Sequence, residues 1–170
     1  ILFTPYSLVN CEYEQEWDRL EIAREQIARM NPFRAVKSMK GIALEKFHAM
    51  KHKYPTKLDI IEKYGYDGKQ VSHLDRVDDY LERYIAGVAY KDCLIPRPSR
   101  RQRMWDYKML NRIPLEQARI EAKEILDHVV EMADEFCSRV PDQECEVMRE
   151  LLEDVSYQIM KISVEKELSK

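Results

Sequence analysis

Glycine, long apolar runs and paired cysteines are all scarce or missing in this sequence. Only four of the 170 residues are glycine, and long stretches without glycine favour helices over hairpins and tight turns. Hydrophobic residues make up 45% and charged residues 35% of the chain, a mixture typical of amphipathic helices that excludes a disordered chain. No apolar run approaches the roughly 20 residues that a membrane-spanning helix needs. We therefore expect a soluble, helical protein with no membrane partner.

The cysteines do not form a recognisable framework. Cys11, Cys93, Cys137 and Cys145 contain no Cys-x-x-Cys pair, and they do not combine with the four histidines into a zinc-ligand pattern. Free thiols in a reducing compartment are the expected state, which favours a cytoplasmic location. No metal site is predicted within this chain.

Motifs of complete active sites are also missing. The sequence has no phosphate-binding G-x-x-x-x-G-K-[ST], no G-x-G-x-x-G and no H-E-x-x-H. It has no Asp-x-Asp pair to hold magnesium ions and no Gly-Ser dipeptide to grip a triphosphate. We therefore predict no catalytic residue and no cofactor for this chain alone.

Apolar residues recur every three or four positions along most of the sequence, as on one face of an amphipathic helix. Prolines interrupt this pattern and mark the ends of helices. The spacing predicts an all-α bundle of five or six helices with a short extended N-terminal segment. We expect one domain over residues 1–170, divided into an extended lead-in at 1–10, a helical region at 11–138 and a final helix at 142–168. The residues predicted to be buried together are Trp17, Leu20, Phe47, Leu74, Val77, Leu81, Val129 and Ile159.

Charge is unevenly distributed, although the net charge is only −3. Residues 97–112 contain six basic residues against one acid, and residues 142–154 contain six acids against one arginine. These segments could pair with each other, bind partners or remain solvated. The candidate nucleic-acid contacts are Arg97, Arg100, Arg101 and Arg103. Only Trp105 and Tyr107 lie nearby, so the regular interleaving of aromatics found in single-strand platforms is missing.

A second basic pattern follows Gly68. Lys69, His73, Arg76 and Arg83 are four, three and seven residues apart, so they fall on one stripe of a helix. Such a stripe suits phosphate groups, because arginine and lysine make charge-assisted hydrogen bonds to phosphate oxygens. Lys40, with Lys37 and Lys46, extends the positive surface in this interpretation. The alternative is an ordinary solvated helix face.

Several segments together carry a resemblance to a known family. They are Leu2-Phe3, Val9-Asn10, Asn31-Pro32, Lys37-Ser38-Met39-Lys40-Gly41-Ile42-Ala43, Tyr64-Gly65-Tyr66-Asp67-Gly68-Lys69-Gln70, His73-Leu74-Asp75-Arg76, Cys93-Leu94-Ile95-Pro96 and Pro114-Leu115-Glu116-Gln117-Ala118. Over residues 1–137 the chain resembles the C-terminal, helical half of the predicted nucleotidyltransferases of the DNA polymerase beta superfamily. The most specific element is the pattern Lys69-x-x-x-His73-Leu74-x-Arg76.

This resemblance implies a chain that is catalytically incomplete. The family's N-terminal half supplies the Gly-Ser signature and the acidic residues that bind Mg²⁺, and this chain lacks both. The resemblance implies three partners: an N-terminal catalytic half in the same or a separate chain, a nucleoside triphosphate, and an RNA or protein acceptor. Lys69, His73, Arg76 and Lys40 would contact the nucleotide or its phosphates. The chain begins at Ile1 without a methionine, so we expect a fragment or a processed piece.

Two other classes compete with this interpretation. One is a non-catalytic interaction or regulatory module, such as an antitoxin-like bundle. The other is a helical RNase of the HEPN type, whose signature places an arginine shortly before a histidine. No arginine stands at the required distance before His48, His52, His73 or His128, so the RNase class is discounted.

Overall fold

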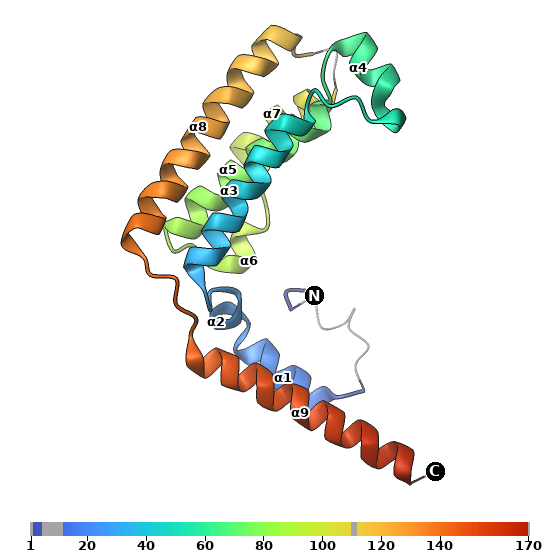
Figure 1. The fold of residues 1–170 in the computed structure, drawn as a ribbon, viewed down its shortest axis with the longest axis vertical. Coiled ribbons are helices and arrows are strands. Elements are labelled where there is room, and N and C mark those ends of the chain that lie inside the picture. The colour runs from blue at the N-terminus through green and yellow to red at the C-terminus, as the bar shows by residue number, and fades with distance from the viewer. Residues whose placement is uncertain (1, 5–11, 110–111, 170) are drawn as a thin grey trace. The chain divides into compact units, whose positions relative to one another are not determined.

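The computed structural model of the chain describes residues 2–4, 12–109 and 112–169 (Figure 1). Every regular element in these ranges is a helix, and no strand occurs in them, which confirms the predicted all-α class. The chain forms two compact units. We call Ile1–Pro32 with Asp142–Lys170 the terminal unit and Phe33–Pro141 the central unit. That the two behave as one domain stays a prediction.

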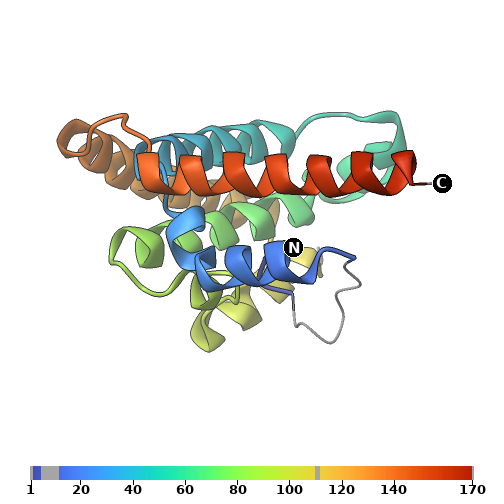
Figure 2. The same cartoon turned by 90° about the horizontal axis from the view of Figure 1, so that it is seen from below.

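The terminal unit contains α1 (Glu14–Ile22), α2 (Arg24–Ala28) and α9 (Glu146–Leu168). Ala23 separates α1 from α2, as the C-cap of the first helix and the N-cap of the second. The Tyr13 hydroxyl lies 2.6 Å from the Ser163 hydroxyl, and Arg19 pairs with Asp154 at 2.6 Å. These contacts hold α1 against α9, which continues past both ends of the shorter α1 (Figure 2). The extended segment predicted at 1–10 lies largely outside the described residues.

The central unit is built from α3 (Pro32–Ala49), a 3-10 turn (Pro55–Lys57), α4 (Leu58–Tyr64), α5 (Gly68–Ile85), α6 (Tyr90–Cys93), α7 (Pro98–Lys108) and α8 (Leu115–Arg139). The corner before α5 follows local rules. Gly65 ends α4 with a φ of 80°, a left-handed conformation that glycine adopts without strain. The Asp67 carboxylate then accepts a hydrogen bond from the Lys69 backbone at 3.0 Å and caps α5.

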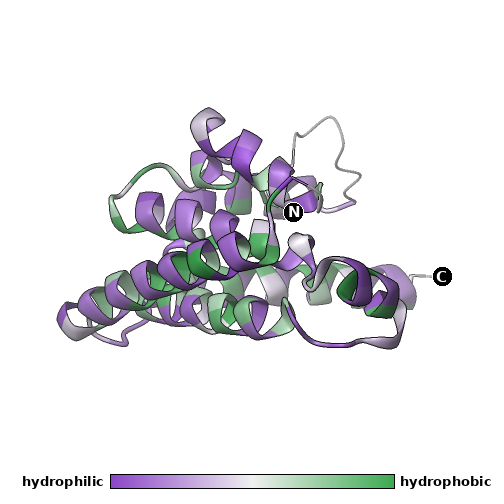
Figure 3. Ribbon diagram, turned by 90° about the horizontal axis from the view of Figure 1, so that it is seen from above, coloured by the Kyte–Doolittle hydropathy of each residue, from purple (hydrophilic) through white to green (hydrophobic). Residues whose placement is uncertain are grey.

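The core of the central unit surrounds α5, which packs against α6, α7 and α8. Leu74 and Leu81 are fully buried in it, together with Val36 of α3 and Val129 of α8. Hydrophobic and hydrophilic residues alternate along each helix, as amphipathic packing requires (Figure 3). Helix α5 is therefore the element from which the surrounding helices take their positions.

The predicted common core is only partly right. Leu74, Val77, Leu81 and Val129 are buried in one cluster, and Phe47 packs against it from its edge. Trp17, Leu20 and Ile159 are half-buried and belong to the terminal unit. Helical periodicity identifies an apolar face but does not specify which other helix covers it, and this explains the error.

Candidate functional site

A cavity of about 260 Å³ lies between α3, α5 and α6 in the central unit. Its apolar lining comes from Met39 and Ile42 of α3, Val77 and Tyr80 of α5, and Tyr90, Cys93 and Leu94 at α6. Three basic side chains, Lys46, His73 and Arg76, complete the lining. No carboxylate is among the residues that line this cavity. We call it the α3–α5–α6 pocket.

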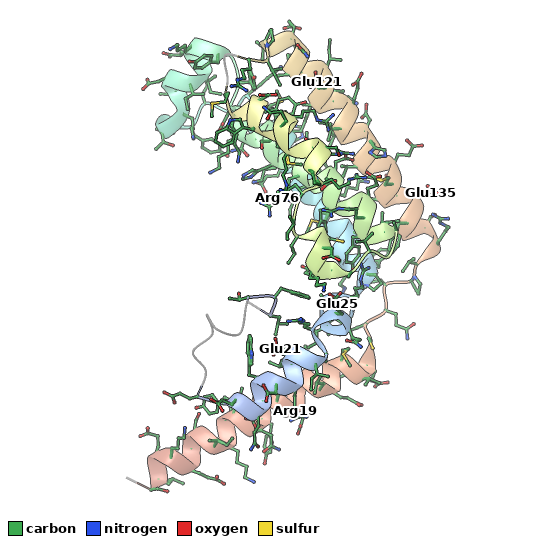
Figure 4. All side chains as sticks on the ribbon, turned by 180° about the vertical axis from the view of Figure 1, so that it is seen from behind. Arg19, Glu21, Glu25, Arg76, Glu121 and Glu135 are labelled. Atoms are coloured by element: carbon green, nitrogen blue, oxygen red, sulfur yellow. The ribbon has the colours of Figure 1, made fainter. Side chains whose placement is uncertain are left out.

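The basic side chains come from two helices. Lys46 projects from α3, while His73 and Arg76 lie one turn apart on α5. Figure 4 shows Arg76 on the side of the central unit away from α8, which carries Glu121 and Glu135. Arg76 donates a hydrogen bond from Nη2 to the Leu94 carbonyl at 3.2 Å, which uses one of its five N–H donors. Lys46 pairs with Glu45 at 2.8 Å, and the Glu45 side chain is 65% exposed, so this pair is weakly held.

His73 experiences a positive environment. Burial lowers its pKa, and the charges of Lys69, Lys46, Lys108 and Arg76 lower it further. The neutral imidazole is therefore favoured near pH 7, and it offers one N–H donor to a ligand. An anion bound beside His73 would reverse the effect of the four cations and favour the protonated ring.

Tyrosines form an aromatic wall of the pocket. The Tyr80 and Tyr90 rings meet edge to face with their centroids 6.0 Å apart, and Tyr80 stacks on Tyr84 at 5.6 Å. Burial, followed by the contact with Tyr90, raises the pKa of Tyr80 far above its ordinary value of 10.0, so its hydroxyl stays protonated. The wall therefore presents aromatic surface and neutral hydroxyl groups.

The structure separates the residues that the sequence placed on one basic stripe. His73 and Arg76 line the pocket, whereas Lys69 is exposed one turn earlier on α5 and is not among the lining residues. Lys40 pairs with Asp134 of α8 at 2.6 Å. Arg83 donates hydrogen bonds to the carbonyls of Asp92, Cys93 and Ile95, so it fastens the segment after α6 and does not face a ligand.

Most of the arginines in residues 97–103 form ion pairs with acids of the same chain. Four acids occupy one face of α5, namely Asp75, Asp78, Asp79 and Glu82, and the three aspartates are buried. Their partners are three arginines on α7 or just before it. Arg97 donates hydrogen bonds to Asp79 and Glu82, and Arg103 donates to Asp75. Arg100 donates to three of the acids, namely Asp75, Asp78 and Glu82. Of the four candidate nucleic-acid contacts, Arg101 alone bonds only to a backbone carbonyl among the described residues, that of Pro96.

These ion pairs shift the titration of both partners. Burial raises the pKa of Asp79, but hydrogen bonds from Arg97 outweigh this effect and lower the pKa below its ordinary value. The hydrogen bond from Arg97 likewise lowers the pKa of Glu82. His128 of α8 adds a contact at 2.6 Å to Asp78. The acidic face of α5 therefore fastens α7 by charge, and the contact with His128 adds to the apolar packing against α8.

Sequence reasoning missed this acidic face, although a signal was present. Acids at positions 75, 78, 79 and 82 recur with helical spacing, and they complement the basic segment that follows. It also missed the tyrosine wall, because Tyr80 and Tyr90 come from different helices that meet only in the folded chain.

A larger cavity of about 620 Å³ lies between the end of α3 and the start of α8. Its lining combines Glu116 and Glu124 with basic residues, namely His48, Lys51, Arg119 and Lys123, whereas the lining of the α3–α5–α6 pocket has no carboxylate. Among the described residues, no three histidine, cysteine or acidic side chains come together as metal ligands would. No helix in the described ranges has both the length and the apolarity to cross a membrane.

Comparisons with protein-family models, with curated proteins and with solved structures find no match to this chain.

Proposed function

We propose that this chain is the nucleotide-side helical module of a polymerase-beta-like nucleotidyltransferase. The observation that carries the proposal is the α3–α5–α6 pocket, where Lys46, His73 and Arg76 converge on a tyrosine-lined cavity that has no carboxylate in its lining. A nucleoside triphosphate combines the two features that this pocket would recognise, an aromatic ring and a chain of anionic oxygens.

The size of the cavity limits how the nucleotide binds. At about 260 Å³ it falls below the usual range of about 300–1,000 Å³ for small-molecule pockets. We therefore place only the base in the cavity, against the edge-to-face pair of Tyr80 and Tyr90, with the phosphates outside at Arg76 and His73. Lys69, one turn before His73 on α5, would extend the phosphate contacts. Lys40 has no part in this arrangement because it is not among the residues that line the pocket.

Chemistry would need a separate, metal-binding half, in the same or another chain. Mg²⁺ held there would neutralise the triphosphate and activate the acceptor hydroxyl of an RNA or protein. The residues of this chain would position the nucleotide, with His73 donating a hydrogen bond. We place this activity in the cytoplasm, in keeping with the predicted free thiols.

Calorimetric titration of the chain with nucleoside triphosphates tests the proposal. Arg76→Ala should weaken binding by about 1.5–3 kcal/mol, the value of a hydrogen bond to a charged group. Arg76→Lys should recover part of this loss, since lysine lacks the guanidinium fork. The matched control is Arg139→Ala on α8, an arginine with a 65% exposed side chain that pairs with Glu135. Equal affinities for wild type, Arg76→Ala and Arg139→Ala would refute the proposal.

A non-catalytic interaction module is the second candidate, and α9 favours it. Tyr157, Met160, Val164 and Leu168 follow each other at three- and four-residue intervals and are each more than half exposed. An exposed apolar stripe of this kind is a feature of protein interaction surfaces. If this class is correct, changing Met160 and Val164 to serine should abolish association with a partner protein, and nucleotides should not bind at the α3–α5–α6 pocket.

A further inference from the structure

One face of α7 remains outside the ion-pair network. Arg101, Trp105 and Lys108 are spaced at four and three residues, so they lie on one stripe of this helix. All three are exposed, and the Trp105 side chain is 51% exposed. The exposed indole offers a large aromatic surface on which a ligand can stack.

The other faces of α7 fix the direction of this stripe. Met104 and Tyr107 are buried, with the Tyr107 hydroxyl bonded to Glu121, while Arg100 and Arg103 reach the acids of α5. Among the described residues, no ion pair joins Arg101 or Lys108 to a carboxylate. Asp106 pairs with Arg112 at 2.6 Å on a different face. The helix is therefore clamped on one side and presents two uncompensated cations around a tryptophan on the other.

We propose that the Arg101–Trp105–Lys108 stripe of α7 binds single-stranded nucleic acid. The indole of Trp105 would stack on one unpaired base, and Arg101 and Lys108, one turn before and after it, would contact the flanking phosphates. Stacking on an aromatic side chain and backbone contacts with cations are the two elements of single-strand recognition. A duplex keeps its bases stacked internally and cannot offer one to the indole.

The position of the stripe suggests a role for the bound strand, that of the acceptor. Helix α7 packs against α5, and α5 carries His73 and Arg76 of the α3–α5–α6 pocket, so the stripe lies on a direct neighbour of the helix that would hold the nucleotide. A strand bound along α7 would bring its end toward that nucleotide as the acceptor. This acceptor role rests on the proposed function, whereas binding of the strand does not.

Fluorescence anisotropy with labelled oligonucleotides of about 12 nucleotides, in the range of single-strand sites, tests the inference without any nucleoside triphosphate. Comparing RNA with DNA strands shows whether binding depends on the sugar, and the matching duplex shows whether binding needs an unpaired base. Trp105→Ala should weaken single-strand binding about five- to 150-fold, as expected for one lost stacking contact. Trp105→Phe should restore part of it.

Arg101→Ala and Lys108→Ala should each lower the slope of log affinity against log salt by about 0.7, whereas Arg139→Ala should leave the slope unchanged. In a Trp17→Phe background, the strand should quench the fluorescence of Trp105, which is then the only tryptophan. Binding of Trp105→Ala and Arg101→Ala within twofold of wild type would overturn the inference. So would equal affinity for the duplex, or for an acidic peptide of the same charge. A failure of Arg76→Ala to affect nucleotide binding would refute only the proposed function, because the strand assay contains no nucleotide.

Discussion

Asp79 illustrates how much single residues of this chain depend on charge. Its carboxylate is 1% exposed and accepts hydrogen bonds from Arg83 at 2.9 Å and from Arg97 at 2.5 Å. Removing one partner of a buried ion pair leaves the other charge without compensation, which is more costly than the pair itself is stabilising. The acidic face of α5 should therefore be sensitive to changes that apolar packing alone would tolerate.

Asp79→Asn should destabilise the central unit by about 3–5 kcal/mol at pH 7. The pKa of Asp79 is lowered by folding from an ordinary value of 3.8. Its stabilising effect is thus present above that value and is lost as the pH falls through the lower, folded pKa. Urea unfolding of wild type and Asp79→Asn at neutral and acidic pH measures this. The difference between the two proteins should shrink below pH about 4, and an equal difference at both pH values would contradict the assignment.

His73 should couple nucleotide binding to proton uptake. Its pKa is lowered in the free chain, and phosphate oxygens beside it would raise the pKa in the complex. Affinity should therefore increase as the pH falls through the interval between the two pKa values and level off below the free value. Calorimetry in buffers of different ionisation enthalpy should report proton uptake, and His73→Gln should abolish it. If His73→Gln takes up as many protons on binding the nucleotide as the wild type does, the group that is protonated is not His73.

At the scale of elements, α5 unites the core and the site. One face buries Leu74 and Leu81, a second pairs its acids with α7, and a third presents His73 and Arg76 to the pocket. Because all three faces belong to one rigid helix, a shift of α5 within the core would move the pocket as well. Core and site are therefore coupled through this helix.

Leu74→Ala and Leu81→Ala should each cost about 2–5 kcal/mol of stability, the usual range for a fully buried leucine. Both side chains are 0% exposed. Chemical denaturation followed by far-UV circular dichroism measures the loss. Met160→Ala on α9 is the control, since its side chain is 60% exposed and little should change. A loss below about 1 kcal/mol at both leucines would mean that α5 does not lie at the centre of the core.

The elements were more predictable from the sequence than their mutual positions. Local signals in the sequence lie at the starts of α3, α5 and α8, where Pro32, Asp67 and Pro114 act through local geometry. The pairing of Asp75 with Arg103 spans 28 residues and depends on how two helices pack, which periodicity does not encode. For the same reason, His73 and Arg76 were identified as neighbours, whereas Tyr90 and Met39 were not connected with them.

At the scale of the whole molecule, the proposed function requires a second component. Among the described residues, no cluster of carboxylates could hold the metal ions that neutralise a triphosphate in the transition state. The chain alone should therefore transfer no nucleotide. Purified chain incubated with labelled triphosphates, Mg²⁺ or Mn²⁺, and RNA or protein acceptors tests this expectation. Reproducible transfer that a point change in the chain abolishes would prove it wrong.

The central claim is that the nucleotide base lies in the α3–α5–α6 pocket, and photocrosslinking locates the base directly. Irradiation of the chain with an azido-adenosine triphosphate, followed by proteolysis and mass spectrometry, identifies the labelled peptide. We predict labelling at Tyr80 or Tyr90, competition by unmodified triphosphate, and loss of the label in Arg76→Ala but not in Arg139→Ala. Labelling confined to other residues, such as those lining the cavity between α3 and α8, would contradict the account.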